Sequence, residues 1–307
     1  MQIGLALPHY DFSFPDGRAA TVNDAVIYAQ RAEQLGFDSL WVSDHLFLSL
    51  DRYGGPARRY GTPEAMTLLT AIAAATSRAR VGTLVLNVSF RHPRILAEQI
   101  KTIDEMSARR VDLGLGAGWN EAEFDSAGIP FGTAGQRMER LSRVTSFLDG
   151  MVNPRVPLWI GGKGGPKGLG IVAESADGWN VVWRMEPQTY KERLDVLAEQ
   201  CDRFKRDPGS VQKSVGFYCL MGEDDADLAR RFEAMRAFIP GLLDNVSLEE
   251  FARGALVGTP ERCAEQIREF DALGVSSVIL AFGPVPFAVA DDEQLDIAAE
   301  QLFPLCS

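Results

Sequence analysis

Residues 81–107 read VGTLVLNVSFRHPRILAEQIKTIDEMS, and this stretch contains one complete strand-loop-helix unit. Val81–Leu86 is a short apolar run of strand length, and Pro93–Ser107 has helical periodicity. Pro93 suits the first turn of a helix, where its missing N–H group would have no partner. The unit therefore predicts a strand followed by a crossover helix, the building block of a parallel sheet.

The same unit recurs along the chain. The apolar runs that predict strands are Ile3–Leu7, Ser39–Val42, Val81–Leu86, Val111–Leu115, Leu158–Ile160, Gly178–Val182, Val215–Met221 and Ser276–Ala281. The segments that predict helices are Thr21–Leu35, Pro63–Thr76, Pro93–Ser107, Gln136–Asp149, Pro187–Lys205, Asp224–Ile239, Thr259–Leu273 and Asp291–Leu302. No long linker divides residues 1–307, so we predict an α/β fold of one closed (β/α)8 barrel, a TIM barrel, rather than two open domains.

Three of these helices carry clear boundary signals. Thr21 precedes a helix that should stop at Gly36, because glycine favours the left-handed helix end. Thr62-Pro63-Glu64 and Thr259-Pro260-Glu261 each resemble a threonine N-cap followed by proline in the first turn.

Composition narrows the functional classes. A net charge of −11 and a pI of about 4.9 argue against a nucleic-acid partner, which needs clustered Lys and Arg. The four cysteines show no CxxC spacing and the chain has only three histidines, so we expect neither a disulfide framework nor a metal site. The N-terminal MQIGLALPHYDF lacks the features of a signal peptide, and no apolar run approaches membrane length, which favours a cytoplasmic protein without a membrane partner.

Active sites of such barrels lie in the loops after the strands. Asp44 and His45 follow the second predicted strand. His45 has the chemistry to donate or accept a proton near pH 7, and Asp44 could orient it or bind a cofactor ring. The structural alternative is a polar loop in which Asp44 caps backbone amides.

Two more loops carry candidate residues. After the third strand, Arg91 and His92 could reach an anionic ligand or merely hold the loop and start the helix. After the fourth strand, Gly114–Asn120 would let backbone approach a flat ring, with Trp119 as a pocket wall. Alternating glycines equally relieve crowding inside a barrel.

The loop after the fifth strand, Gly161–Lys167, reads GGKGGPK. Backbone N–H groups at a helix start and lysine charge suit a phosphate, and a flexible solvent turn is the alternative. The GK[ST] ending of a Walker A loop is missing. Together the four loops could hold a planar ring, a polar chain and a phosphate, which is the shape of a phosphorylated flavin.

The ordered motifs GFDSLWVSDH, VGTLVLNVSFRHP, RRVDLGLGAGWNEAEF and PLWIGGKGGPKGLGIVAESADGWN resemble the bacterial luciferase-like oxidoreductase family along almost the whole chain. The resemblance implies a (β/α)8 barrel. It is strongest to the branch that depends on the deazaflavin coenzyme F-420, and related members use FMN.

The resemblance also implies site residues by position. Asp44 and His45 match the pair beside the cofactor ring, and Asn87 matches a cofactor-contacting position. The remaining matches are Gly116, Ala117 and Gly118 for the ring floor, Gly161, Gly162, Lys163 and Gly164 for the phosphate loop, and Leu84-Val85 for a peptide that is often cis and bulges toward the ring. Trp119 and Ser49 stand where sugar-phosphate dehydrogenases of the branch carry glutamate and tryptophan, which makes glucose 6-phosphate a poor substrate.

The resulting hypothesis is an oxidoreductase in which coenzyme F-420 exchanges a hydride with a small organic substrate, with His45 as proton donor. The first alternative is an FMN-dependent monooxygenase that uses reduced flavin and dioxygen, and the second is a barrel that binds flavin without turnover. Relatives are often homodimers, and a separate reductase or dehydrogenase would regenerate the reduced cofactor.

Overall fold

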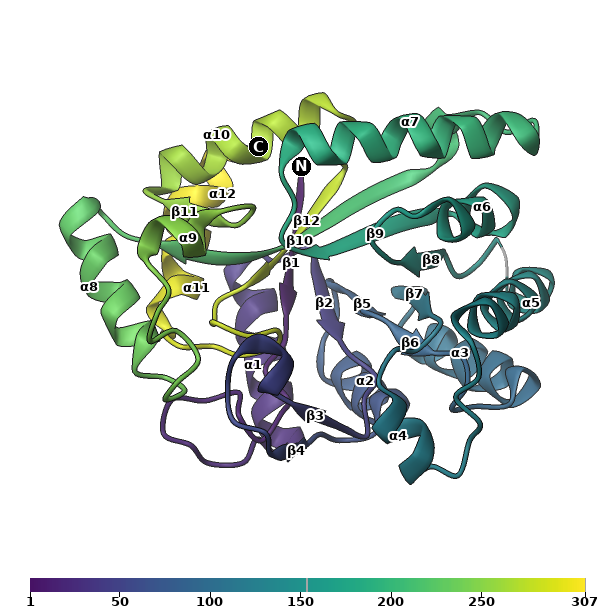
Figure 1. Cartoon of the computed structure of the whole chain (residues 1–307), viewed down its shortest axis with the longest axis horizontal. Coiled ribbons are helices and arrows are strands. Elements are labelled where there is room, and N and C mark those ends of the chain that lie inside the picture. Colours follow the sequence, from purple (N-terminus) through teal and green to yellow (C-terminus); the bar gives the residue numbers. More distant parts are fainter. Residues whose placement is uncertain (153, 307) are drawn as a thin grey trace.

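Parallel strands form a closed ring in the computed structural model, which describes residues 1–152 and 154–306. The strands of the ring are β1 (Gln2–Ala6), β2 (Ser39–Val42), β5 (Arg80–Thr83), β7 (Val111–Gly116), β8 (Leu158–Gly161), β9 (Gly178–Trp183), β10 (Gln212–Met221) and β12 (Ser277–Ala281). The ring closes because β10 pairs with both β9 and β12, and β12 pairs with β1 (Figure 1). The predicted (β/α)8 barrel is confirmed.

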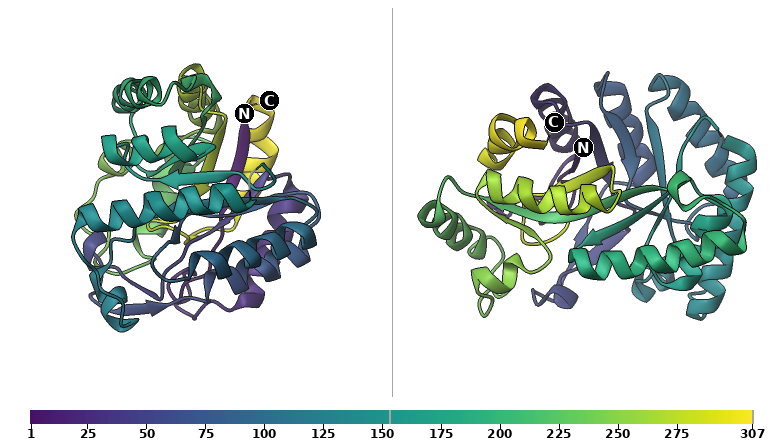
Figure 2. Two further views of the ribbon diagram at one scale, coloured as in Figure 1. Left: turned by 90° about the vertical axis from the view of Figure 1, so that its right-hand side faces the viewer. Right: turned by 90° about the horizontal axis from the view of Figure 1, so that it is seen from above.

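Helices surround the barrel. Helices between successive barrel strands include α1 (Val22–Leu35), α2 (Ala65–Ala75), α3 (Pro93–Met106), α5 (Ala134–Val152), α6 (Pro166–Ser175), α7 (Pro187–Arg203) and α10 (Pro260–Ala272). The remaining helices are α4 (Glu121–Ser126), α8 (Asp225–Arg236), α9 (Leu248–Ala252), α11 (Glu293–Ile297), a π-helical turn at Ala298–Leu302, and α12 (Phe303–Cys306). Figure 2 shows the two chain ends side by side, and the amino group of Met1 donates to the carbonyl oxygen of Cys306 at 3.4 Å.

Two helix starts match the sequence prediction and one does not. Thr21 forms a capping box with Asp24, and α1 ends at Gly36 with φ of 97°. Thr259 caps α10 with Pro260 in the first turn. The predicted cap at Thr62 is wrong, because the Glu64 side chain accepts the N–H of Thr67 and the helix begins after Glu64.

Some elements lie outside the predicted alternation. The predicted strand Val81–Leu86 is divided into β5 and β6 (Leu86–Asn87) by the cis peptide Leu84-Val85. The helix α6 starts behind the glycine loop as expected, although its range was not among the predicted helical segments, and β11 (Leu256–Gly258), which pairs with β10 outside the ring, was not predicted. A hairpin of β3 (Phe47–Ser49) and β4 (Arg59–Gly61) follows β2, with a 3₁₀ turn at Asp51–Tyr53 between its strands.

Two buried tryptophans occupy the face of the strands opposite to the helices. A Cβ atom added to Gly82 would lie 2.5 Å from Trp41, and one added to Gly178 would lie 2.3 Å from Trp159. Glycine is therefore required at both positions for the indoles to fit. The Trp41 indole donates to Ser39 Oγ at 2.9 Å, so its N–H group is satisfied inside the barrel.

Within the described part of the chain, no helix is both long and apolar enough to cross a membrane.

Candidate functional site

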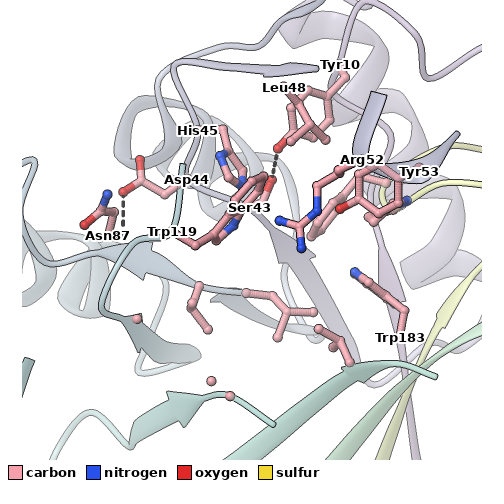
Figure 3. A pocket seen from close by; sticks show the side chains of 18 of the residues that line it. Tyr10, Ser43, Asp44, His45, Leu48, Arg52, Tyr53, Asn87, Trp119 and Trp183 are labelled. Atoms are coloured by element: carbon pink, nitrogen blue, oxygen red, sulfur yellow. Dashed lines mark hydrogen bonds between the residues drawn. The ribbon is translucent and has the colours of Figure 1, made fainter. Parts of the chain in front are cut away.

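A cavity of about 760 Å³ lies at the carboxyl ends of the barrel strands (Figure 3). This volume is typical of a small-molecule site. The predicted site residues that line it are Asp44, His45, Leu84, Val85, Asn87, Gly116, Ala117, Gly118, Gly161, Gly162 and Lys163. Gly164 does not line it, because it packs against Trp179 and Arg193 with φ of +76°.

Asp44 is held by Arg91 and not by the neighbouring histidine. Arg91 donates to both carboxylate oxygens of Asp44, at 2.6 and 2.9 Å, and the backbone N–H of Asn87 donates at 2.8 Å. Arg91 also pairs with Glu64. Burial alone would lower the pKa of Arg91, but the hydrogen bonds and charges of Asp44 and Glu64 outweigh this effect and raise the pKa of Arg91. Arg91 is thus engaged within the protein, which favours the loop-holding interpretation over an anion site.

His92 also has a structural role in this loop. Its ring accepts the backbone N–H of Arg94 at 3.3 Å and caps α3. The ring does not belong to the cavity lining.

His45 is oriented by Glu123, a residue that the sequence reading did not single out. Its Nδ1 lies 2.8 Å from Glu123 Oε2, and the other carboxylate oxygen accepts the N–H of Leu46 at 2.6 Å. Glu123 comes from α4 and is only 2% exposed. Since a carboxylate only accepts, Nδ1 carries the hydrogen of the neutral ring. No described residue bonds Nε2, which is therefore the nitrogen available to a ligand.

The two strand-end glycine motifs meet around Val85. A Cβ atom added to Gly116 would lie 2.5 Å from Val85 Cγ2, and one added to Gly161 would lie 2.7 Å from Val85 Cγ1. The glycines therefore make room for the Leu84-Val85 peptide, which is cis. The result is a wall of backbone and one small aliphatic side chain, which a flat ring can approach.

The loop after β8 offers free backbone donors, although not at every predicted position. The N–H of Gly162 is already bonded to the carbonyl oxygen of Asn180 at 3.0 Å. The N–H groups of Lys163 and Gly164 have no partner among the described residues, and α6 begins at Pro166 directly behind them. The Lys163 amine contacts the carbonyl oxygen of Val182, and burial, aided by the charge of Arg52, lowers its pKa.

Buried polar side chains form a hydrogen-bonded chain next to His45, whose ring centre lies 6.4 Å from that of Tyr10. Tyr10 and His9 both bond Ser43, with Tyr10 OH 2.5 Å and His9 Nε2 3.0 Å from Ser43 Oγ. His9 Nδ1 donates to the carbonyl oxygen of Leu7 at 2.6 Å. Burial lowers the pKa of His9 to about 4, so the ring is neutral at pH 7. Burial likewise raises the pKa of Tyr10, so its hydroxyl stays protonated.

Sequence reasoning also missed three further residues of the cavity lining. Arg52 and Tyr53 come from the hairpin after β2, and Trp183 comes from the end of β9 (Figure 3). Trp119 lines the cavity as predicted and is 45% exposed. The sequence around an arginine in a short loop does not indicate whether its side chain contacts a ligand or only solvent.

These residues fit a phosphorylated flavin or deazaflavin. An added Cβ at Gly162 would meet nothing within 4 Å, so the cavity has free space against that backbone. The free amides of Lys163 and Gly164 suit a phosphate, and the Val85 wall suits a ring. Across the described ranges, no group of three or more His, Cys, Asp or Glu is placed to hold a metal ion.

Comparison with known proteins places the chain in a family. The model of the luciferase-like monooxygenase family matches residues 1–146 and 140–277. An F-420-dependent glucose-6-phosphate dehydrogenase of Microbacterium testaceum is 32% identical over 303 aligned residues, covering 84% of this chain and 86% of the relative.

Solved structures share the fold. An F-420-dependent secondary alcohol dehydrogenase, in complex with an F-420-acetone adduct, has a TM-score of 0.77 and 20% identity and covers 100% of this chain and 99% of that one. The EDTA monooxygenase of Chelativorans sp. BNC1 has the same TM-score of 0.77 with 16% identity, covering 100% and 93%. The chain belongs to the luciferase-like monooxygenase family, because the family model matches most of its length and the barrel agrees with that match.

Proposed function

We propose that this protein is an oxidoreductase that binds coenzyme F-420 and exchanges a hydride with a small organic substrate. The similarity to an F-420-dependent dehydrogenase over 84% of the chain supports the coenzyme. The feature of the site that supports the chemistry most directly is His45, whose Nδ1 is bonded to Glu123 while Nε2 is left for a ligand. The same proposal takes residues 1–307 as one domain with one cofactor site at the carboxyl ends of the strands.

Two groups of residues would hold the coenzyme. Leu84, Val85 and Asn87 would contact the ring together with the strand-end residues Gly116, Ala117 and Gly118. The phosphate would lie at the loop after β8, where Lys163 and Gly164 supply N–H groups and Gly161 and Gly162 leave space. The bound coenzyme supplies the two-electron transfer, and the protein supplies position and proton handling.

His45 is the proposed proton donor. Glu123 fixes its tautomer and stabilises the imidazolium, the form from whose Nε2 the proton would be donated, and the neutral ring would take a proton back at the same atom in the reverse direction. Asp44, which Arg91 holds in place, accepts the backbone N–H of Asn87 and so shapes the ring site, and its proposed role is positioning rather than proton transfer.

A second candidate function is an FMN-dependent monooxygenase that uses reduced flavin and dioxygen. It is favoured by the family model, which describes monooxygenases, and by the fold shared with the EDTA monooxygenase. The Val85 wall and the phosphate loop would accept either cofactor, because F-420 and FMN both have a fused ring system and a ribityl phosphate.

Dioxygen dependence separates the two functions. Protein loaded with oxidised F-420 is offered secondary alcohols, and protein loaded with reduced F-420 is offered carbonyl and enoyl compounds, both without dioxygen. We expect a change in coenzyme absorbance under these anaerobic conditions. Turnover that occurs only with reduced FMN and dioxygen would replace this proposal with the monooxygenase.

Three further features belong to the proposal. A homodimer and a separate reductase or dehydrogenase that regenerates the reduced cofactor follow from the family resemblance. A cytoplasmic location is supported by the four cysteines, which are all free thiols in the structure. Gel filtration with light scattering tests the dimer.

A further inference from the structure

Three cations line the cavity without a carboxylate partner. Arg52, Lys163 and Arg184 form no ion pair with any described residue, although the whole chain carries a net charge of −11. The carboxylates in the described lining are Asp44 and Glu123, which already bind Arg91 and His45. The cavity therefore has a surplus of positive charge, which an anionic ligand would neutralise.

Of these cations, Arg52 is the one whose donors are all unused. Lys163 bonds the carbonyl oxygen of Val182, and Arg184 bonds those of Phe251 and Arg253. The Arg52 guanidinium makes no hydrogen bond within residues 1–152 and 154–306. A guanidinium presents N–H groups in a planar fork that matches a carboxylate.

Trp119 holds this guanidinium near the proposed proton donor. The Arg52 guanidinium carbon lies 3.8 Å from the centre of the Trp119 ring. The Trp119 ring in turn meets His45 edge-on, with 5.6 Å between ring centres. Stacking restricts the position of the cation but leaves its N–H groups free. Figure 3 shows Arg52, Trp119 and His45 around the same space.

The lining beyond these cations is largely apolar. The apolar side chains come from the hairpin, from the segment between α8 and α9 and from the loop after β12, and they include Leu48, Leu242, Leu243, Val246, Pro286 and Phe287. A ligand with one acidic group and an apolar body would match both surfaces.

We propose that Arg52 is a specificity residue for an acidic substrate, an organic acid whose carboxylate bonds its guanidinium while the apolar body lies against this wall. This rests on the proposed function and extends it, since the carboxylate would lie beside the Trp119 ring that also contacts His45. The phosphate of the coenzyme is a second anion that Arg52 could bind. Arg52 is close enough to Lys163, in the proposed phosphate loop, for its charge to lower the pKa of that lysine. The test therefore distinguishes the two anions.

The test is calorimetric titration of the F-420-loaded protein with acids and their amides: octanoate with octanamide, and phenylbutyrate with phenylbutyramide. The variants are Arg52→Gln, Arg52→Lys and, as control, Arg58→Gln. Arg58 lies on the same hairpin and stacks 4.7 Å from the Tyr60 ring centre, but it does not line the cavity. Coenzyme affinity is measured for each variant first.

We expect the wild type and Arg58→Gln to bind each acid about tenfold more tightly than its amide, as a charge-assisted bidentate contact would give. Arg52→Gln should remove most of this preference, Arg52→Lys should keep part of it, and coenzyme affinity should stay within about twofold. The proposal would be overturned if the wild type bound an acid no more tightly than its amide, or if it bound neither of them.

Two other outcomes are informative. If Arg52→Gln weakens coenzyme binding about tenfold and leaves the acid preference intact, Arg52 binds the coenzyme phosphate and the proposal is wrong. If F-420 does not bind the wild type, the same titrations are run on the empty protein. An acid preference that Arg52→Gln removes would then support Arg52 while the proposed function fails.

Discussion

Glu123 Oε2 lies 2.8 Å from Nδ1 of His45, although the two residues are 78 positions apart in the chain. His45 follows β2 and Glu123 lies on α4 after β7, so the barrel brings the two together. The carboxylate also accepts the N–H of Leu46, and this fixes the backbone beside the ring. A proton-transfer group is thus oriented by a buried charge from another loop.

Replacing Glu123 with glutamine should slow turnover more than it weakens substrate binding. The amide oxygen still accepts the N–H of Leu46, but the neutral group no longer stabilises a charged imidazole. We expect kcat to fall roughly 100-fold with KM within about threefold, and the pH profile of kcat to change. Steady-state kinetics over a pH series checks this. The control is Glu121→Gln on the exposed side of α4, and an unchanged kcat for Glu123→Gln would contradict the proposed stabilisation of the His45 imidazolium by Glu123.

His9 should make the protein less stable as the pH falls below about 6.5. Burial lowers its pKa from 6.5 to about 4 in the folded protein, so between these values the unfolded chain binds more protons. Unfolding is therefore favoured as pH falls, by about 2 kcal/mol between pH 7 and pH 5 from this group. Urea denaturation should show a shallower pH dependence over this interval for His9→Asn. Equal slopes for the two proteins would contradict the assignment.

Arg91 should be essential for stability. Asp44 is 5% exposed, so Arg91→Ala would leave a buried carboxylate without its cation. We expect the free energy of unfolding to fall by about 3–5 kcal/mol in urea denaturation. Arg94→Ala, which removes an exposed ion pair with Glu98, should cost less than about 1 kcal/mol. Adding Asp44→Asn to Arg91→Ala should recover part of the loss, and a small effect of Arg91→Ala alone would contradict the buried pair.

Gly162→Val should weaken coenzyme binding without unfolding the protein. An added Cβ meets no protein atom within 4 Å, so the side chain would occupy cavity space that the phosphate end of the coenzyme needs. We expect the Kd for F-420 to rise at least about tenfold while the melting temperature changes little. Gly150→Val is the control, because Gly150 is equally uncrowded and lies on α5 outside the cavity lining. Unchanged affinity of Gly162→Val would remove the loop from the site.

The barrel could be predicted because its strands are buried on both faces, which gives short continuous apolar runs such as Ser39–Val42. Composition and periodicity alone gave no sign of the break between β5 and β6, because Leu84 and Val85 are ordinary strand residues, and only the family resemblance pointed to the cis peptide between them. The hairpin after β2 was missed because strands of three residues carry little periodicity.

The site was only partly predictable for a related reason. Residues directly after strands, such as Asp44 and Gly116, could be identified because the fold places all strand ends at one face. Glu123 and Arg52 lie several residues beyond the ends of β7 and β2, on α4 and in the 3₁₀ turn of the hairpin. Glu121 and Glu123 look alike in the sequence, and only the folded chain shows that Glu123 is buried against His45.

The most direct test of the proposed function is a parallel titration of purified, cofactor-free protein with F-420 and with FMN, followed by fluorescence and by calorimetric heat. We predict that the protein binds F-420 at least about tenfold more tightly than FMN, and that Gly162→Val loses this binding. Tighter binding of FMN, or binding of neither cofactor, would contradict the assignment of this site to F-420.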